Sequence, residues 1–262
     1  MSATLRVERD GPFARVTLAR PEVRNAFNAT VIEELRSAFE ALGVEPPETL
    51  RGVVLAGEGR TFSAGADVEW MRDAMKLGVE ENERDAAAMQ GMFAAIDACP
   101  VPVIARVQGA ALGGGMGLCA VSDIVIATAD ATFGFTETRL GIIPAVISTF
   151  VLPKIGESHA RALFATGQRF DADRARAIGL VHEVVSDDAA LDAAVEAVLE
   201  ELRAAGPTAI RAAKALVRTI GELGPDAARE RTPGLIARQR TSAEGQEGLT
   251  AFLEKRPPAW KG

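Results

Sequence analysis

A dense group of glycines marks the stretch VQGAALGGGMGLCAVSD, residues 107–123. The glycines that crowd into five positions are Gly113, Gly114, Gly115 and Gly117. Glycine costs backbone entropy wherever it is placed, so such a cluster indicates that something approaches the main chain closely. Phosphate is one candidate. However, no Lys-Ser or Lys-Thr pair follows the glycines and the G-x-G-x-x-G spacing is absent, so a nucleotide-binding loop is not indicated.

A second loop of small residues, GRTFSAGADVEWM at 59–71, follows the apolar run GVVLAG. Both loops come after strand-like segments and lead into predicted helices, and ligands bind at the carboxyl ends of parallel strands. Two such loops side by side would direct two main-chain N–H groups at one oxygen, which is an oxyanion hole. The N–H of Gly114 would also lie in the first turn of a helix, whose dipole favours the same negative charge. The alternative is that each loop is only a tight strand-to-helix turn.

The elements that must position these loops follow from hydrophobic patterning. Residues 4–9 and 13–19 alternate around Gly11-Pro12 and predict a hairpin. A capping box from Thr30 to Glu33 predicts the start of a helix. Strands are expected at 50–57, 101–107 and 123–129, with helices between them, which favours a parallel sheet. From about residue 158 the pattern becomes mostly helical, and one apolar helix face is closed by Gly206-Pro207.

Composition excludes several classes of protein. The 262 residues carry a formal net charge of −7, with no long Lys/Arg block, so neither nucleic acid nor a membrane surface is an expected partner. The start of the chain lacks the layout of a signal peptide, and no apolar run could span a bilayer, so we expect a cytoplasmic protein.

The side chains available for catalysis are few. Tyrosine is absent, and the only histidines are His159 and His182. We expect both histidines to have structural or surface roles. Cys99 and Cys119 lie in apolar surroundings and indicate reduced core residues rather than a catalytic thiol. No paired-ligand spacing is present, so no metal site is expected.

Several motifs in the right order resemble the crotonase superfamily, the enoyl-CoA hydratases and isomerases. They are FSAGAD, GAALGGG, SDIVIATADATFGFTETRLGIIP, the N-terminal LARPEVRNAFNATVIEEL and the C-terminal EGLTAFLEKRPPAWKG. The resemblance implies an α/β fold, a spiral of ββα units whose C-terminal helices build homotrimers or dimers of trimers. We therefore expect a spiral core at 1–200 and a helical trimerisation region at 201–262.

The resemblance also implies an acyl-CoA thioester substrate, with coenzyme A as part of the substrate and no tightly bound cofactor. By position, the oxyanion donors are Ala66 and Gly114. The residues that match the CoA-contacting positions are Arg24, Ala26, Ala64, Asp67 and Val68. Phe252 and Lys255 match positions from which a neighbouring subunit covers the adenine and its phosphates. For Lys255, a solvated charge on the tail is an equal alternative.

The family's familiar hydratases use two glutamates, and only one is present here. Glu137 in FGFTETRLG matches the second of them, whereas the first falls on Gly117, which has no side chain. Phe133 and Phe135 beside Glu137 predict a raised pKa suited to proton transfer. The alternative is a surface glutamate or an ion pair with Arg139. The acyl group is expected against 70–93, where methionines give either a pocket lining or plain core.

Three functions are compatible with these residues. The first is hydration of a 2-enoyl-CoA with a single glutamate, the acyl group being branched or carboxylated, because the motifs are similar to the methylglutaconyl-CoA hydratase-like branches. The second is a Δ3,Δ2-enoyl-CoA isomerase, in which one base moves a proton between the α and γ carbons. The third is a homologue that binds acyl-CoA without catalysis.

Overall fold

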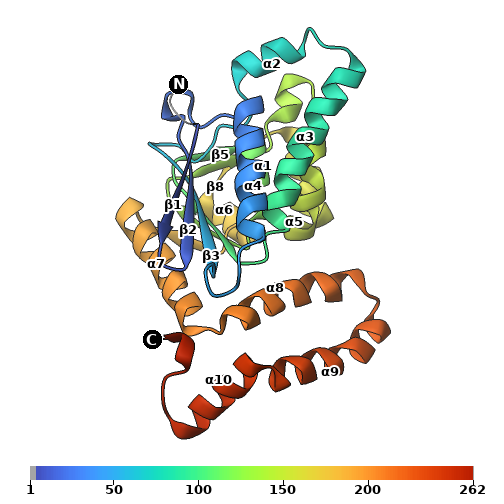
Figure 1. Cartoon of the computed structure of the whole chain (residues 1–262). Coiled ribbons are helices and arrows are strands. Elements are labelled where there is room, and N and C mark those ends of the chain that lie inside the picture. The colour runs from blue at the N-terminus through green and yellow to red at the C-terminus, as the bar shows by residue number, and fades with distance from the viewer. Residues whose placement is uncertain (1–3, 262) are drawn as a thin grey trace.

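The computed structural model describes residues 4–261, which form a body of two sheets covered by helices and a C-terminal helical arm (Figure 1). The chain opens with the predicted hairpin, in which β1 (Leu5–Asp10) pairs antiparallel with β2 (Phe13–Leu18). The larger sheet then continues through parallel strands in the order β1-β2-β3-β4-β6-β9. Its later members are β3 (Gly52–Gly57), β4 (Val103–Val107), β6 (Ile124–Thr128) and β9 (Glu183–Val185). The expected parallel α/β architecture is confirmed.

A second sheet of three very short strands lies beside the carboxyl ends of the first. It runs in the order β5-β7-β8, formed by β5 (Ala110–Leu112), β7 (Thr132–Gly134) and β8 (Arg169–Asp171). β5 leads directly into α4 (Gly114–Val121), so this sheet carries the glycine cluster. β7 leads into the short 3-10 helix η2 (Glu137–Leu140). The second sheet thus places the glycine cluster and Glu137 at neighbouring positions.

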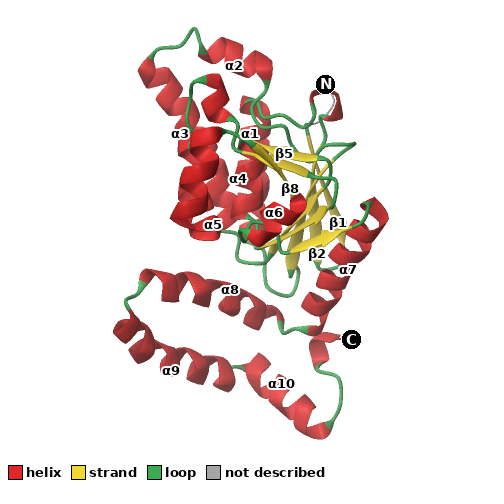
Figure 2. Cartoon of the chain, turned by 180° about the vertical axis from the view of Figure 1, so that it is seen from behind, coloured by secondary structure: helices red, strands yellow, loops and turns green. Residues whose placement is uncertain are grey.

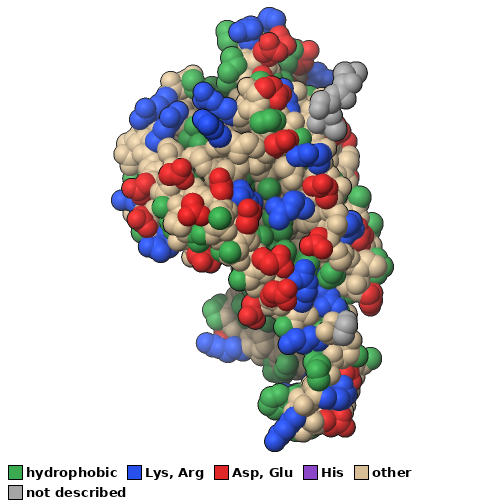
Figure 3. Space-filling model, turned by 90° about the vertical axis from the view of Figure 1, so that its left-hand side faces the viewer, with side chains coloured by type: hydrophobic (Ala, Val, Ile, Leu, Met, Phe, Trp, Pro, Cys, Tyr) green, Lys and Arg blue, Asp and Glu red, His purple; other side chains and the backbone are tan. Residues whose placement is uncertain are grey.

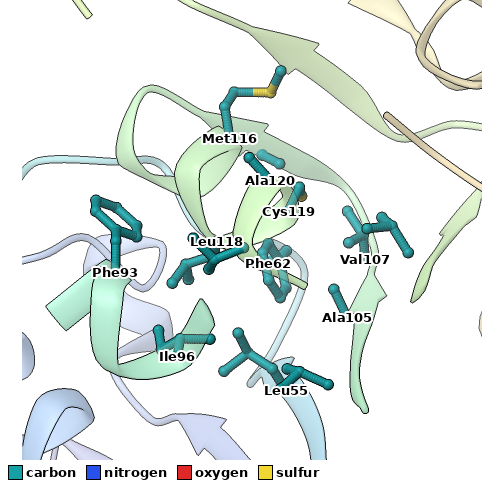
Figure 4. Packing of buried hydrophobic residues seen from close by; sticks show 14 of the residues in the cluster. Leu55, Phe62, Phe93, Ile96, Ala105, Val107, Met116, Leu118, Cys119 and Ala120 are labelled. Carbon is teal, nitrogen blue, oxygen red and sulfur yellow. The ribbon is translucent and has the colours of Figure 1, made fainter. Parts of the chain in front are cut away.

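Helices cover both faces of the larger sheet (Figure 2). On one side, α1 (Ala29–Gly43), α3 (Val79–Asp97), α4 and α5 (Ala145–Thr166) enclose the main core. α7 (Asp188–Ala204) packs on the other side through a smaller apolar cluster that includes Leu191, Val195 and Leu199. Between these, α2 (Val68–Ala74), α6 (Ala172–Ala177) and the 3-10 helix η1 (Pro21–Val23) are short connecting helices. Figure 4 shows how α4 enters the core, with Leu118 and Cys119 facing strand and helix residues on several sides.

The predicted N-cap of α1, Thr30, is wrong, because the cap lies two residues earlier, at Asn28. The helix begins at Ala29, and the Asn28 side chain accepts the N–H of Val31 at 3.0 Å, so Thr30 lies inside the first turn rather than at the cap. Asn and Thr both cap helices well, and the asparagine that comes first along the chain takes the position. The predicted apolar face of the helix is confirmed, because Ile32, Leu35 and Phe39 are buried.

The C-terminal arm consists of α8 (Pro207–Glu222), α9 (Pro225–Thr241) and α10 (Ala243–Glu254), followed by the 3-10 helix η3 (Ala259–Lys261). Figure 3 shows it standing out from the body, with apolar atoms among its charged side chains. The expected boundary between the core and the helical region, at residues 200 and 201, falls within α7. That helix ends at Ala204, with Ala205 as its C-cap. The predicted stop at Gly206-Pro207 is confirmed, since Pro207 opens α8.

Long cationic side chains attach α8 to the body. Arg211 donates to the Leu50 carbonyl, and Lys214 reaches both the Val101 carbonyl at 3.0 Å and Asp123 at 2.6 Å. These acceptors precede β3, β4 and β6 respectively, so α8 lies at the amino ends of the parallel strands. The two predicted oxyanion loops follow the opposite ends of the strands.

Candidate active site

The two glycine-bearing loops are joined by main-chain hydrogen bonds. Ser63 and Ala111 form an isolated parallel bridge. Within it, the Ser63 N–H donates to the Ala110 carbonyl and the Leu112 N–H donates to the Ser63 carbonyl, both at 3.0 Å. The loop that follows β3 is therefore hydrogen-bonded to β5, which ends at Leu112, immediately before the glycine cluster.

Ala66 is held so that its own N–H faces away from its neighbours. A second isolated bridge pairs Phe27 with Ala66. The Phe27 N–H donates to the Gly65 carbonyl at 2.7 Å, and the Asp67 N–H donates to the Phe27 carbonyl at 2.8 Å. In such a bridge the middle residue directs its N–H and C=O to the other side. Within residues 4–261, no main-chain hydrogen bond outside helices and strands has the Ala66 N–H as its donor.

The Gly114 N–H is the second predicted donor. Gly114 is the first residue of α4, and first-turn N–H groups have no partner within their own helix. Gly113 before it has a positive φ of 49°, which glycine adopts without a steric penalty. A Cβ on Gly65 would lie only 3.2 Å from the Gly114 nitrogen and 2.7 Å from the Leu112 oxygen. The loops of the predicted donors Ala66 and Gly114 are thus in direct contact.

Each glycine of the cluster meets a different neighbour. A Cβ on Gly115 would lie 2.6 Å from the Ser63 oxygen, and one on Gly114 would lie 2.7 Å from the Phe27 ring. A Cβ on Gly113 would stand 3.6 Å from Oε1 of Glu137. The close approach inferred from the sequence is therefore made by the second loop and by side chains of the protein itself.

The Glu137 carboxyl group lies against the glycine cluster in a largely apolar setting. Its Oε2 atom is buried and has no hydrogen-bond partner among the described residues. Burial raises the pKa of Glu137, an effect that its own main-chain N–H partly offsets. The raised pKa predicted from the sequence is confirmed. The alternative of an ion pair with Arg139 is not seen, because no ion pair within residues 4–261 includes Arg139, whose side chain packs over Gly167.

The position of the missing glutamate is filled by apolar side chains. Gly117 lies one helical turn beyond Gly113, and a Cβ there would come within 2.6 Å of both Phe93 and Ile147. Phe93 belongs to a row of aromatic rings, with centroids 6.4 Å from Phe27 and 6.0 Å from Phe150. Position 117 therefore offers no space for a glutamate side chain while Phe93 and Ile147 stay in place.

The predicted CoA-contacting residues gather at the Phe27–Ala66 bridge. Arg24 is exposed with a left-handed main chain, and its carbonyl accepts the Ala64 N–H at 3.0 Å. Ala26 is buried and Val68, at the start of α2, is exposed. We call these five residues the rim, and only Arg24 and Val68 among them have exposed side chains.

Asp67 in the same group is engaged within the protein. Its carboxylate pairs with Arg20 at 2.9 Å, and it also caps α2 by accepting the Glu69 N–H at 2.9 Å. Arg20 in turn donates to the Ala26 carbonyl at 2.8 Å. Both carboxylate oxygens of Asp67 therefore have partners before any ligand arrives, so a ligand would meet its main chain.

Phe252 and Lys255 are not brought to this site within one chain. Phe252 is 80% exposed on α10, and Lys255 ends that helix in a left-handed conformation. Both views place α10 at the opposite end of the molecule from α2 (Figures 1 and 2). Of the methionines expected near the acyl group, Met92 is buried in the core and Met75 is exposed, while Met89 packs against the core.

The remaining candidates have structural roles. Burial raises the pKa of Cys119 to about 12 and also raises that of Cys99, so neither thiol is activated. Nδ1 of His182 accepts the Val125 N–H at 2.9 Å, which makes it a support for β6. Over residues 4–261, no acidic, His or Cys side chains cluster in threes as a metal site would require. In the same range, no helix has the length and hydrophobicity to cross a membrane.

Sequence reasoning missed the residues that shape the loops through tertiary contacts. Asn25 and Phe27 hold the Ala66 segment, while Phe93 and Ile147 pack on Gly117. One signal was available for Asn25, because asparagine is the non-glycine residue that most readily adopts the left-handed conformation seen there.

Comparison with known proteins gives concordant results. A sequence model described as enoyl-CoA hydratase/isomerase matches residues 8–262. The structure is similar to that of AtuE from Pseudomonas aeruginosa, with 39% identity, a TM-score of 0.94 and coverage of 99% of this chain and 100% of that one. It is also similar to an enoyl-CoA hydratase from Shewanella pealeana, at 37% identity, a TM-score of 0.92 and coverage of 98% and 96%. The 2,3-dehydroadipyl-CoA hydratase of Escherichia coli is 32% identical over 94% of both chains.

Proposed function

Because the chain belongs to the enoyl-CoA hydratase/isomerase family, whose crotonase fold it shares, we propose that it hydrates a 2-enoyl-CoA thioester with a single glutamate. The observation that carries the proposal is the position of Glu137. Its buried carboxyl group lies beside Gly113, the residue before the proposed oxyanion donor Gly114.

The thioester carbonyl accepts hydrogen bonds from Ala66 and Gly114. As water adds to the β carbon, the π bond between the α and β carbons breaks and negative charge moves to the thioester oxygen. Donors fixed in advance stabilise that charge, and removing one such donor typically lowers the rate by about 10²–10³-fold. The dipole of α4, which starts at Gly114, acts in the same direction.

Glu137 moves the protons. As a carboxylate it takes one proton from the attacking water, so that hydroxyl oxygen bonds to the β carbon. As a carboxylic acid it then gives a proton to the α carbon, which completes the addition and restores the carboxylate. A raised pKa suits this exchange, because the group must both accept and release a proton near neutral pH.

The CoA portion lies along the rim formed by Arg24, Ala26, Ala64, Asp67 and Val68. Arg24 supplies positive charge on an otherwise acidic protein, which an anionic ligand needs. Within residues 4–261, no main-chain hydrogen bond outside helices and strands uses the Ala64 carbonyl, so it can accept one from the adenine amino group.

The acyl group is proposed to be branched or carboxylated. The support is the similarity of FSAGAD and FGFTETRLGIIP to the methylglutaconyl-CoA hydratase-like branches. The E. coli relative, named as a hydratase of 2,3-dehydroadipyl-CoA, also fits a carboxylated group.

A specific observation favours isomerisation as the second candidate. Phe93 and Ile147 occupy the space at Gly117, so the face where a second carboxylate would hold water is apolar. A lone Glu137 can move one proton between the α and γ carbons of a 3-enoyl-CoA without water. The same oxyanion donors would stabilise the dienolate formed on the way.

Assembly as a homotrimer, or a dimer of trimers, completes the proposal. The arm exposes large apolar side chains that the body does not cover: Leu216, Val217, Ile236, Leu249, Phe252 and Leu253. Covering this area with a second copy would remove it from water. In such an assembly Phe252 and Lys255 of one subunit can approach the CoA rim of its neighbour.

The deciding experiment compares the protein with its Glu137→Gln variant on crotonyl-CoA, 3-methylglutaconyl-CoA and a 3-enoyl-CoA. Loss of the conjugated-enoyl absorbance with the unmodified protein alone supports the hydratase, and the preferred ester identifies the acyl class. Appearance of that absorbance from the 3-enoyl ester, without hydration, supports the isomerase. Tight binding of all three esters without turnover would instead identify a protein that binds acyl-CoA without catalysis.

A further inference from the structure

Asn25 is buried, every polar group it carries has a partner, and the proposed reaction does not use it. Its Nδ2 donates to the Glu58 and Thr61 carbonyls at 2.9 and 2.7 Å. Its Oδ1 accepts the Arg20 N–H at 3.0 Å, and its own N–H donates to the Arg20 carbonyl at 2.9 Å. One side chain thus ties the turn before α1 to the loop after β3.

The main chain at Asn25 is in the left-handed region, with φ of 54°, directly after Arg24 with φ of 56°. Two consecutive non-glycine residues in this conformation persist only where the surroundings hold them. Gly57 leaves room for the Asn25 side chain, because a Cβ on Gly57 would lie 2.8 Å from Nδ2 of Asn25.

From Asn25 a continuous set of contacts leads to the Ala66 donor. The Ser63 hydroxyl donates to the Asn25 carbonyl at 3.0 Å and accepts the Gly65 N–H at 3.3 Å. Two residues further, Phe27 binds Gly65 and Asp67 on either side of Ala66. Residues 24–27 therefore run alongside 64–67 and leave the Ala66 N–H as the donor that faces the site.

We propose that Asn25 is a positioning residue for the oxyanion donor Ala66, acting through Ser63 and the main chain of residues 24–27. The inference rests on the proposed function, because it concerns how the same oxyanion hole is aligned. Asn25 touches no reacting atom. It fixes the conformation of the strand-like segment against which the Ala66 loop is registered.

The test uses Ser63→Ala, which removes the link while leaving Asn25 in place. Ser122→Ala is the matched control, because Ser122 is equally buried and its hydroxyl also donates to a main-chain carbonyl, at the far end of α4. The probe is butyryl-CoA labelled with ¹³C at the thioester carbonyl, which has no double bond to hydrate. Its carbonyl chemical shift is recorded free and bound.

The unmodified protein and Ser122→Ala are expected to move the bound carbonyl signal downfield to the same extent. Ser63→Ala should retain less than half of that displacement, with kcat on crotonyl-CoA lowered about tenfold and KM changed less than twofold. A misaligned donor weakens polarisation of the carbonyl, whereas a merely structural loss would not separate kcat from KM in this way.

A pair of Asn25 variants addresses the side chain itself. Asn25→Gly keeps the left-handed main chain and removes the clamp, so it should fold and reproduce the reduced displacement. Asn25→Ala loses both and should also lose stability. Full displacement and unchanged kcat in Ser63→Ala or Asn25→Gly would overturn the inference. Absence of any displacement or binding in the unmodified protein would instead overturn the proposed oxyanion hole.

Discussion

Phe93 packs directly on Gly117, so closely that a Cβ at position 117 would lie 2.6 Å from Cζ of the ring. Phe93 comes from α3 and Gly117 from α4, and both are fully enclosed. Ile147 of α5 makes an equally close approach to the same Cβ position. Helices α3, α4 and α5 therefore meet at one position that only glycine fits.

Gly117→Ala is expected to destabilise the protein by about 1–3 kcal/mol, because the added methyl group overpacks a dense core. Urea unfolding measures the change. Combining Gly117→Ala with Phe93→Leu should recover part of the loss, since the shorter side chain frees the space. The control is Gly221→Ala on α8, where an added Cβ would meet nothing within 4 Å. This substitution should stabilise the helix by about 0.5–1 kcal/mol, because alanine has the higher helix propensity. Equal effects at the two glycines would contradict the packing.

Glu137→Gln is expected to raise the free energy of unfolding at pH 8 while leaving only a small residual turnover. Burial raises the pKa of Glu137, so the folded state holds its proton more tightly than the unfolded state does. The folded protein therefore loses stability as the pH rises through and above the ordinary glutamate pKa. Glutamine has no proton to lose, so the gain should shrink towards pH 5. Glu83→Gln, at an exposed position on α3, is the control and should show no such trend.

The pH dependence of the rate should report the same group. If Glu137 must be ionised to accept the proton of water, kcat/KM rises with pH through an apparent pKa above the ordinary glutamate value. The residual rate of Glu137→Gln should be flat over that range. A limb that persists unchanged in the variant would assign the titration to another group.

The Arg20–Asp67 ion pair gives a prediction about the rim. Arg20→Leu leaves the Asp67 carboxylate buried without its cation, a loss of about 3–5 kcal/mol in comparable cases. Adding Asp67→Asn removes the stranded charge and should recover part of that loss. A double-mutant cycle by urea unfolding measures the coupling, and strictly additive losses would show that the two side chains do not interact.

Exposed apolar residues of the arm predict the assembly. The double variant Val217→Glu with Leu253→Glu should sediment at the single-chain mass of 27.6 kDa, whereas the unmodified protein sediments at a multiple of it. Val44→Glu, at an equally exposed apolar position of the body, should leave the mass of the assembly unchanged. An unmodified protein that sediments as a single chain would exclude the proposed trimer.

Much of the larger sheet could be predicted because its signals are long. The apolar runs at 50–57, 101–107 and 123–129 each contain a buried strand, and the hairpin has clear alternation. The second sheet was not predicted, since strands of three residues such as β7 are too short to show a period. The start of α1 was misplaced because two good capping residues, Asn28 and Thr30, compete within one turn.

Some residues of the candidate site could likewise be predicted from the sequence, and others could not. The glycine cluster was noticed from its density alone, whereas Glu137 was singled out because its segment resembles the crotonase superfamily, and the catalytic roles of Gly114 and Glu137 stay predictions. Asn25 and Phe93 could not be found in that way, because their roles arise only where distant segments meet. The raised pKa of Glu137 was foreseeable from its aromatic neighbours, whereas the filled space at Gly117 was not.

The meeting of α3, α4 and α5 at Gly117 also limits how such sequences can diverge. A lineage that acquires a larger residue at 117, a glutamate included, must also change or move the side chains at both 93 and 147. Substitutions at these three positions are therefore expected to appear together across homologues, with small and large residues exchanging places. The identity of residue 93 would then reveal, from sequence alone, whether a relative can accommodate a second carboxylate.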